Sequence, residues 1–532
     1  MHEPGASAEI DHGQGTRPSH RLMRSILLRA LGLVYLTAFG SLAVQVDGLI
    51  GSRGILPAAD YLDRVRRIVG TVPPWVIWHV PTVFWIDATD RMLNAGCWVG
   101  AIAGILLAAG LLPGPCLAVA WGLYLSLTVV AQDFLSFQWD MLLLESGLLA
   151  MLITPWTRRL AVSKDEPWRP AIWLFRWLVF RLMFLSGVVK LAYGDRTWIE
   201  WRALDYHYLT QPLPTWTSWF MYQLPWWFHR ASVGLMFYAE LIAPFFIFGP
   251  RVLRRAGFVS LVLLQLLILS TGNYGCFNIL AIVLCLSVLD DRDLGAVESL
   301  PRRWRRHPEV PDRPAAGVFH AWSIPRRAVV GTLGGVLVLV TIAEGIGEVW
   351  PETEIPWLVD RLVAWTRPLR SANSYGLFRV MTTDRKEITV EGSDDGKTWK
   401  PYRFRWKPGE LDRRPRFATP HMPRLDWQMW FAALAPNCLR QNWFIAFEQR
   451  LLEGSPAVLG LLRENPFPAR PPRYIRARLS LYSFTGPGSR DWWTSRDLGL
   501  YCPPFELRGS LDTSGPGRSA ALATLGGTLE RR

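Results

Sequence analysis

Five ionisable residues lie inside stretches that are otherwise apolar enough to cross a membrane: Asp140, Glu145, Arg181, Lys190 and Glu240. A charge near the centre of a bilayer costs at least about 2.5–3.5 kcal/mol on insertion scales, so these side chains are expected to face one another rather than lipid. We refer to the five residues as the intramembrane polar cluster.

The spacing of the cluster along its helices sets the depth of each residue. At a rise of 1.5 Å per residue, Arg181 and Glu240 lie near mid-depth, whereas Asp140 and Lys190 lie near the outer surface. Rise alone therefore allows an Arg181–Glu240 pair or an Arg181–Glu145 pair. Two interpretations follow. Either ion pairs hold the helices in register, or the residues line a polar cavity that opens outward with Lys190 at its rim.

Aromatic residues crowd the outer loop at 193–229. Its six tryptophans are too many for one interfacial belt, so we expect some to pack under the C-terminal domain and others to offer an apolar surface to an unfolded client protein. The alternative is that all of them anchor in lipid headgroups. The residues predicted for an outer cavity or client surface are Trp198, Trp201, His207, Asn273, Tyr274 and Asn278, the last three of which also suit a tight turn.

The motifs of common soluble enzymes do not occur in this sequence: it has no nucleophile elbow, P-loop, HExxH, GxGxxG or paired CxxC. No metal site and no cofactor are predicted. The acidic segment EGSDDGKTW lacks the ligand spacing of an EF-hand and is interpreted as a hairpin tip. Four of the six cysteines lie in or beside apolar segments, whereas Cys438 and Cys502 can form a disulfide if the C-terminal domain is extracytoplasmic.

The composition indicates a membrane protein with a soluble appendage. The chain has 532 residues, is 50% hydrophobic and contains several apolar runs near 20 residues. Its net charge of +14 could suit nucleic acid, but the arginines cluster between apolar runs, as cytoplasmic membrane-flanking charge does. We therefore expect membrane lipid and not nucleic acid around the chain. The predicted spans are 26–46, 91–110, 113–132, 138–154, 171–192, 230–249, 256–271, 275–290 and 327–346.

The predicted fold is a polytopic α-helical membrane bundle of about nine spans followed by a mixed, mostly β soluble domain. In that domain, residues 385–406 alternate around Asp394-Asp395-Gly396, which predicts a hairpin, and residues 473–484 alternate again as a strand. Residues 425–454 have helical spacing and a glycine stop. The domains are predicted at 1–25 (disordered, cytoplasmic), 26–346 (membrane bundle), 351–508 (soluble domain) and 509–532 (disordered tail).

The distribution of arginine predicts the orientation of the bundle. The positive-inside rule places the N-terminus in the cytoplasm and, after nine crossings, the soluble domain outside. Four arginines in the first outer loop run against this assignment. These four exceptions are Arg53, Arg64, Arg66 and Arg67.

The bundle is expected to contain its own polar pairs and to insert without the soluble domain.

Several long segments of the chain resemble one known family, the lipase maturation factors. In the bundle they are FQWDMLLLESGLLA (137–150), FRLMFLSGVVKL (180–191), WRALDYHYLTQPLPTWTSWF (201–220) and GNYGCFNILAIVLCLSVLDD (272–291). In the soluble domain they are SANSYGLFRVMTTDRKEITVEGSDDGKTW (371–399) and PPRYIRARLSLYSFT (471–485). The resemblance implies a multi-pass membrane protein that helps a secreted, lipase-like client to mature. It would lie in the endoplasmic reticulum membrane of a eukaryote or the plasma membrane of a bacterium.

A shorter segment, SGVVKL (186–191), resembles the membrane part of vitamin K-dependent gamma-carboxylases. That resemblance implies a general base at Lys190. Two classes of function are therefore open: a membrane-embedded maturation or folding factor that is not an enzyme, and an integral membrane enzyme that uses Lys190. Neither resemblance specifies an oligomeric state.

Overall fold

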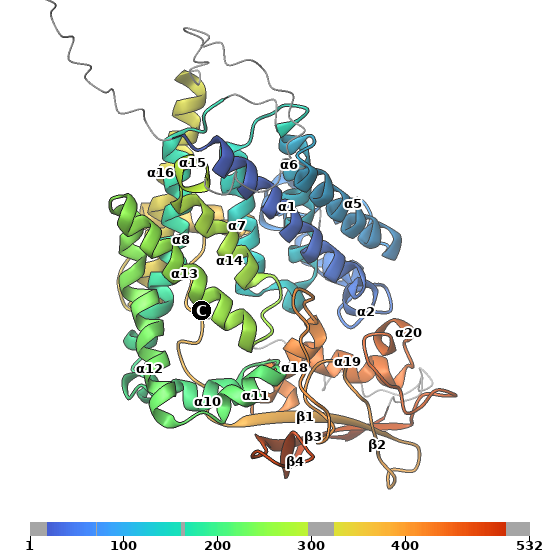
Figure 1. Cartoon of the computed structure of the whole chain (residues 1–532). Coiled ribbons are helices and arrows are strands. Elements are labelled where there is room, and N and C mark those ends of the chain that lie inside the picture. The colour runs from blue at the N-terminus through green and yellow to red at the C-terminus, as the bar shows by residue number, and fades with distance from the viewer. Residues whose placement is uncertain (1–18, 71, 161–164, 296–323, 507–532) are drawn as a thin grey trace, which may run out of the picture.

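The computed structural model describes residues 19–70, 72–160, 165–295 and 324–506. Figure 1 shows a bundle of long helices whose lower end packs against a C-terminal domain containing a β-sheet and several helices. The first helix begins at Arg21, inside the stretch expected to be disordered. The predictions for residues 1–18 and for the tail from 509 lie outside the described residues.

Seven helices in the described part of the chain are long and apolar enough to cross a membrane. Two shorter helices, α7 (Gln138–Ile153) and α14 (Phe277–Cys285), occupy the remaining predicted spans. Most residues of α7 are buried, because other parts of the protein surround it. The membrane bundle of about nine spans is therefore confirmed. The seven long spans are α1 (Arg21–Ala43), α5 (Asp90–Ala109), α6 (Pro113–Val130), α8 (Arg169–Ala192), α12 (Trp226–Phe237) continued by η4 (Tyr238–Ile242) and η5 (Ala243–Phe248), α13 (Arg251–Thr271) and α16 (Ile324–Val349).

Local sequence explains how α5 begins, ends and packs. The hydroxyl of Thr89 accepts a hydrogen bond from the backbone of the first turn, and Gly110 ends the helix with a φ of +77°. Gly104 meets Gly32 of α1, where a Cβ on Gly32 would lie 2.7 Å from the carbonyl oxygen of Gly104. Small residues let membrane helices approach this closely, so a side chain at either glycine would push α1 and α5 apart.

Short helices connect the spans at the end of the bundle nearest the C-terminal domain. The segment after α1 forms an amphipathic helix, α3, and then two short helical turns broken by prolines. The predicted outer loop is also helical in part. At the opposite end lies α15 (Asp291–Leu294). The connecting elements are α2 (Val46–Ile50), α3 (Ala58–Val69), α4 (Pro74–His79), η1 (Val83–Trp85), η2 (Gln132–Leu135), α9 (Arg196–Ile199), α10 (Ala203–Thr210) and α11 (Trp216–Tyr222).

The C-terminal domain contains a four-stranded antiparallel sheet in the order β2-β1-β3-β4. The predicted hairpin connects β1 to β2, with Glu391 opposite Pro401, and Gly396 takes a φ of +69° at the tip. The predicted strand at 473–484 is β3, whereas β4 was not predicted, because bulges and Gly499 interrupt its alternation. The strands are β1 (Arg385–Ser393), β2 (Lys400–Pro401), β3 (Tyr474–Phe484) and β4 (Trp493–Phe505).

Helices cover one part of this sheet. The helical pattern at 425–454 is divided into two helices, because Pro436 has no N–H to donate and its ring disfavours a continuous helix. Gly454, with a φ of +66°, ends the second helix as predicted. A disulfide joins Cys438 to Cys502. The other helical elements are α17 (Trp357–Thr366), η9 (Arg367–Leu369), α18 (Arg424–Leu434), η10 (Cys438–Arg440), α19 (Asn442–Leu452) and α20 (Pro456–Leu459).

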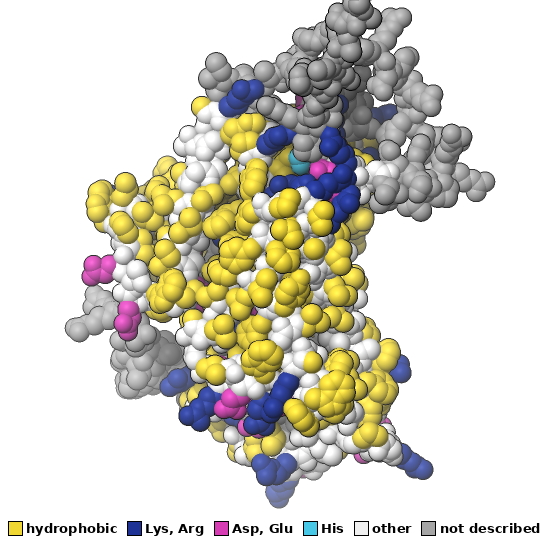
Figure 2. Space-filling view, turned by 60° about the vertical axis from the view of Figure 1, so that its left-hand side comes forward, with side chains coloured by type: hydrophobic (Ala, Val, Ile, Leu, Met, Phe, Trp, Pro, Cys, Tyr) yellow, Lys and Arg dark blue, Asp and Glu magenta, His cyan; other side chains and the backbone are white. Residues whose placement is uncertain are grey.

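Charged side chains gather at the two ends of the molecule, and hydrophobic side chains cover most of the face between them in Figure 2. At the end away from the C-terminal domain, Arg254 pairs with Asp290 at 3.0 Å, and Arg251 and Arg255 each pair with Asp293 at 2.7 Å. A hydrophobic face between two charged ends is what a bilayer-spanning bundle requires. The multi-pass architecture therefore follows from the surface as well as from the helix lengths.

Candidate functional site

The five residues of the intramembrane polar cluster take part in three separate ion pairs, two within the cluster and one with a residue of the C-terminal domain. In the first, the guanidinium of Arg181 on α8 contacts the carboxylate of Glu145 on α7, and both side chains are buried. This is one of the two pairs that helix rise allowed. The other allowed pair, Arg181–Glu240, does not form, because Glu240 pairs with Lys190 instead.

The Arg181–Glu145 pair is completed by a segment of the C-terminal domain. Arg181 donates a hydrogen bond to the backbone carbonyl of Asn373 at 2.6 Å. The other oxygen of Glu145 accepts one from the hydroxyl of Tyr375 at 2.7 Å and one from the amide of Asn373 at 3.3 Å. A buried charge is stable only when its hydrogen-bonding capacity is used, so residues 373–375 contribute directly to the stability of the bundle.

The second pair joins Lys190 on α8 to Glu240. The ammonium nitrogen lies 2.9 and 2.7 Å from the two carboxylate oxygens and 3.1 Å from the carbonyl oxygen of Ser186. It also lies 5.2 Å from the centre of the Trp198 ring. Gly187 permits this contact, since a Cβ there would lie 3.0 Å from the Cβ of Glu240.

Lys190 is buried, so it does not form the rim of an open cavity as the second interpretation required. Its three N–H groups are used by two oxygens of Glu240 and the oxygen of Ser186, so a role as a base would require Glu240 to release it. Glu240 lies in a π-helical turn, η4. Such turns are frequent at functional sites.

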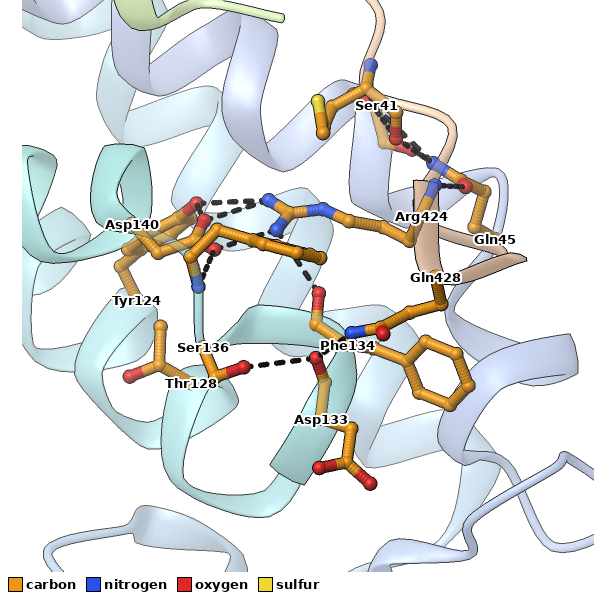
Figure 3. Close-up of polar contacts among 12 residues, drawn as sticks. Ser41, Gln45, Tyr124, Thr128, Asp133, Phe134, Ser136, Asp140, Arg424 and Gln428 are labelled. Atoms are coloured by element: carbon orange, nitrogen blue, oxygen red, sulfur yellow. Dashed lines mark hydrogen bonds and ion pairs between the residues drawn. The ribbon is translucent and has the colours of Figure 1, made fainter. Parts of the chain in front are cut away.

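The third pair links the bundle to the C-terminal domain and is drawn in Figure 3. Arg424, the first residue of α18, contacts both oxygens of Asp140, at 2.6 and 2.8 Å. Arg424 also donates to the carbonyl of Phe134 at 3.1 Å, and Tyr124 donates its hydroxyl proton to Asp140 at 2.6 Å. Asp140 is 0% exposed. Paired parallel hydrogen bonds of this kind combine strength with a fixed geometry, so this contact fixes where α18 docks.

Polar groups at the C-terminal end of α1 support the same docking site. Gln45 donates to the carbonyl of Met422 at 2.9 Å and accepts from the backbone N–H of Arg424 at 2.9 Å. Ser41 accepts from the backbone N–H of Met422 at 2.8 Å. On α18, the amide of Gln428 donates to the carbonyl of Asp133. The start of α18 is therefore held by α1, η2 and α7 together.

The residues predicted for an outer cavity or client surface are mostly inside the protein. Asn273 donates to the carbonyls of Leu213 and Arg416 and accepts from the backbone of Ala418, so it joins the outer loop to the C-terminal domain. Asn278 donates to Gln265 at 2.8 Å inside the bundle. Both asparagines are buried.

Tyr274 is also buried, and its hydroxyl donates to Gln211 at 3.0 Å and lies 3.2 Å from Nε2 of His207. Burial, followed by the nearby charge of Lys190, lowers the pKa of His207 to about 4, so this imidazole is neutral at physiological pH. The indole of Trp198 donates to the carbonyl of Phe378 at 2.9 Å. Of the six residues predicted for this surface, Trp201 is the one whose side chain is strongly exposed.

Tryptophans of the outer loop pack against the C-terminal domain, as predicted for some of them. Besides Trp198, Trp219 contacts Trp492 with ring centres 5.4 Å apart, and Trp216 contacts Phe417 at 5.9 Å. Trp226 and Trp227 remain exposed, at 64% and 58%. The loop therefore has one set of aromatic residues under the domain and another set facing outward.

Sequence reasoning missed the partners that the C-terminal domain supplies. Arg424 directly precedes the segment predicted to be helical, and Tyr375 lies in a segment that was singled out only for its family resemblance. Arg385 is buried as well, and it donates to the carbonyls of Leu209 at 2.8 Å and Pro212 at 3.0 Å in the outer loop. One signal was available: Asp140 had no cation assigned to it, and a buried carboxylate needs one.

The described residues contain no group of three or more His, Cys, Asp or Glu side chains placed to hold a metal ion. The arrangement unites a membrane bundle and a soluble domain through buried charge. It also leaves an aromatic surface beside the junction. Exposed apolar surface of this kind often marks a site that contacts another macromolecule or a membrane.

Comparison with known proteins identifies the family. The sequence model of the lipase maturation factor transmembrane domain matches residues 22–296, and that of the lipase maturation factor C-terminal domain matches residues 371–503. The chain is 35% identical to lipase maturation factor 2 of Gallus gallus, over 92% of this chain and 82% of the relative. The chain belongs to the lipase maturation factor family. Members of this family with similar identity include lipase maturation factor 2 of Homo sapiens (35%, 92% of this chain, 83% of the relative) and lipase maturation factor 1 of Bos taurus (35%, 92% and 90%). No solved structure matches this lipase maturation factor family member.

Proposed function

We propose that this chain is a maturation factor for a secreted lipase and that it binds the client on the side of the membrane where the C-terminal domain lies. The observation that carries the proposal is the exposed aromatic surface of the outer loop. Phe220 and Leu224 of this loop are exposed together with Trp201, Trp226 and Trp227. Exposed apolar surface of this kind can bind the hydrophobic segments that an unfolded client displays.

The side of the membrane is supported by two independent features. Arginines concentrate at the end of the bundle away from the C-terminal domain, which the positive-inside rule assigns to the cytoplasm. The Cys438–Cys502 disulfide requires an oxidising compartment to persist. In a eukaryotic cell that compartment is the lumen of the endoplasmic reticulum, and in a bacterium it lies outside the plasma membrane.

The proposal is tested by removing the outward aromatic side chains without touching those that pack inside. Trp226→Ser/Trp227→Ser in the full chain should lower the activity of a co-expressed secreted lipase in the medium, while the amount and membrane insertion of the variant stay unchanged. Trp156 is a matched control, because it is 66% exposed at the opposite end of the bundle. Trp156→Ser should leave the secreted lipase activity unchanged.

Site-specific cross-linking distinguishes client binding from membrane anchoring. A photoreactive side chain at position 227 should capture the lipase during its maturation, whereas one at position 156 should not. Capture of lipid alone at position 227, together with full secreted activity in the double variant, would show that these tryptophans are headgroup anchors and would contradict the proposal.

A further inference from the structure

A cleft of about 690 Å³ lies between α3 of the bundle and α19 of the C-terminal domain, away from the buried ion pairs and the aromatic surface. Its lining is strongly charged. Three arginines come from α3, one arginine comes from α19, and two aspartates come from α3. The charged residues of this α3–α19 cleft are Asp60, Asp63, Arg64, Arg66, Arg67 and Arg450.

Two of the four arginines already have acidic partners. Arg66 pairs with Asp63 at 3.0 Å and lies 5.5 Å from the centre of the Trp85 ring. Arg450 pairs with Glu453 at 2.7 Å and donates to the carbonyl of Gly54. These contacts fix the walls of the cleft.

The remaining two arginines have only neutral partners among the described residues. Arg64 donates to the side-chain oxygen of Gln132 at 3.2 Å, and Arg67 donates to the backbone carbonyl of Asp63 at 3.4 Å. Each guanidinium has five N–H donors, so most of the donors on both groups are free for an anion. A phosphate group is the anion that arginine recognises best with parallel hydrogen bonds.

The position of the cleft identifies the source of the phosphate. Arg64 contacts Gln132, the first residue of η2, two positions after the end of α6, and α3 lies between the end of α1 and the start of α5 along the chain. The cleft is therefore level with the ends of the spans, where phospholipid headgroups lie. Two isoleucines of the same connecting segment, Ile68 and Ile86, are 84% and 86% exposed, which suits contact with acyl chains rather than with water.

The topology gives no other reason for these cations. Arginines that follow the positive-inside rule lie at the opposite end of the bundle, so those on α3 are exceptions to it. We propose that the α3–α19 cleft binds the headgroup of an anionic phospholipid, with Arg64 and Arg67 on the phosphate and Asp60 accepting a hydrogen bond from a headgroup hydroxyl or ammonium. This lipid would contact the bundle and the C-terminal domain at once. The site goes beyond client maturation and does not depend on it.

The test measures lipid binding to the purified full-length protein in mixed micelles, with no client present. Phosphatidylglycerol should bind and raise the unfolding temperature, and phosphatidylcholine should do so less. Arg64→Gln/Arg67→Gln should weaken the binding of phosphatidylglycerol at least about tenfold, because two charge-assisted contacts are lost. Arg490→Gln/Arg496→Gln is the matched control: it removes the same charge from exposed positions of the C-terminal domain and should have no effect.

Three results would overturn the inference. Equal weakening in the two double variants would mean that lipid is attracted only by net charge. Inorganic phosphate that binds as tightly as phosphatidylglycerol would make the ligand a soluble phosphate instead of a lipid. An acidic peptide that binds in competition with phosphatidylglycerol, and more tightly, would make the cleft a protein-binding site. If Arg64→Gln/Arg67→Gln loses lipid binding but still supports lipase maturation, the lipid site and the proposed function are independent of each other.

Discussion

Replacing Arg424 by methionine should release the C-terminal domain from the bundle. Methionine keeps most of the length and apolar contact of arginine but removes both hydrogen bonds to Asp140, at 2.6 and 2.8 Å. Asp140 then stays buried with Tyr124 as its remaining side-chain donor. Removing one partner of a buried ion pair costs about 3–5 kcal/mol, because the other charge is left unpaired. The docked state should therefore lose roughly two to three and a half powers of ten in population relative to the undocked state.

A second substitution separates the cost of the stranded charge from the value of the pair. In Arg424→Met/Asp140→Leu both charges are gone, and apolar replacement of a buried pair is often close to neutral. Docking should recover to within about 1–3 kcal/mol of the unaltered protein, the remainder reflecting the lost partner of the Tyr124 hydroxyl. The exposed Arg478–Asp497 pair provides a control: Arg478→Met should cost about 0–1 kcal/mol.

Amide hydrogen exchange in detergent micelles measures this directly. Exchange of the α18 amides reports the free energy of local opening, which should fall by the amounts given above while the amides of α1 and α5 change little. If the α18 amides of Arg424→Met exchange at the same rate as those of the unaltered protein, the ion pair does not hold the domain on the bundle. A double variant that opens as easily as the single variant would show that the loss comes from packing and not from an unpaired charge.

Three further predictions follow from other residues. Burial raises the pKa of Glu448 to about 8, so the contribution of this residue to the stability of the C-terminal domain should be greatest below about pH 4.5 and should fall, by on the order of 4 kcal/mol, as the pH rises to 8. Glu448→Gln should therefore remove this part of the difference in stability that urea unfolding measures between pH 5 and pH 8. Lys190→Met should lower the melting temperature in detergent, because it leaves the buried carboxylate of Glu240 without its cation. Lys190→Met/Glu240→Met should restore most of that loss. A Lys190→Met variant with an unchanged melting temperature would contradict this prediction. If the C-terminal domain is extracytoplasmic, alkaline phosphatase fused after residue 509 should be active and a fluorescent protein fused there should not fluoresce. The reverse pattern would refute this orientation.

The membrane spans could be predicted because their signal is local. An apolar run near 20 residues is sufficient evidence for a span, and the Arg181–Glu145 pair was one of the two pairs that helix rise allowed. The hairpin at Asp394-Asp395-Gly396 was also a local signal. Features carried by a few adjacent residues were therefore predictable.

The partner of Glu240 was not predicted, because depth counting assumes regular α-helices. The π-helical turn at Tyr238–Ile242 alters the helix geometry at Glu240 itself. Depth counting also placed Lys190 near the outer surface of the membrane. In the structure its side chain is buried, and Trp198 of the outer loop lies over its ammonium group. A long side chain can reach more than one turn along its helix, so depth alone does not select a partner.

The contacts between the bundle and the C-terminal domain could not be predicted, because their residues are far apart in sequence. Arg424 lies 284 positions after Asp140, and Tyr375 lies 230 positions after Glu145. No periodicity or motif connects such pairs. A carboxylate without an assigned cation was the only sign that a partner was missing.

The bundle contains polar pairs of its own, Arg181–Glu145 and Lys190–Glu240, but it does not supply every polar partner that its buried carboxylates need. Asp140 obtains its cation from the C-terminal domain, and Glu145 obtains two of its hydrogen bonds there. Until residues 373–424 dock, both carboxylates lie among apolar helices with part of their hydrogen-bonding capacity unused, a condition that burial makes costly. Docking thus completes the bundle as well as the domain. The outer loop packs under the same domain through Trp198 and Arg385, so docking also fixes the position of this loop.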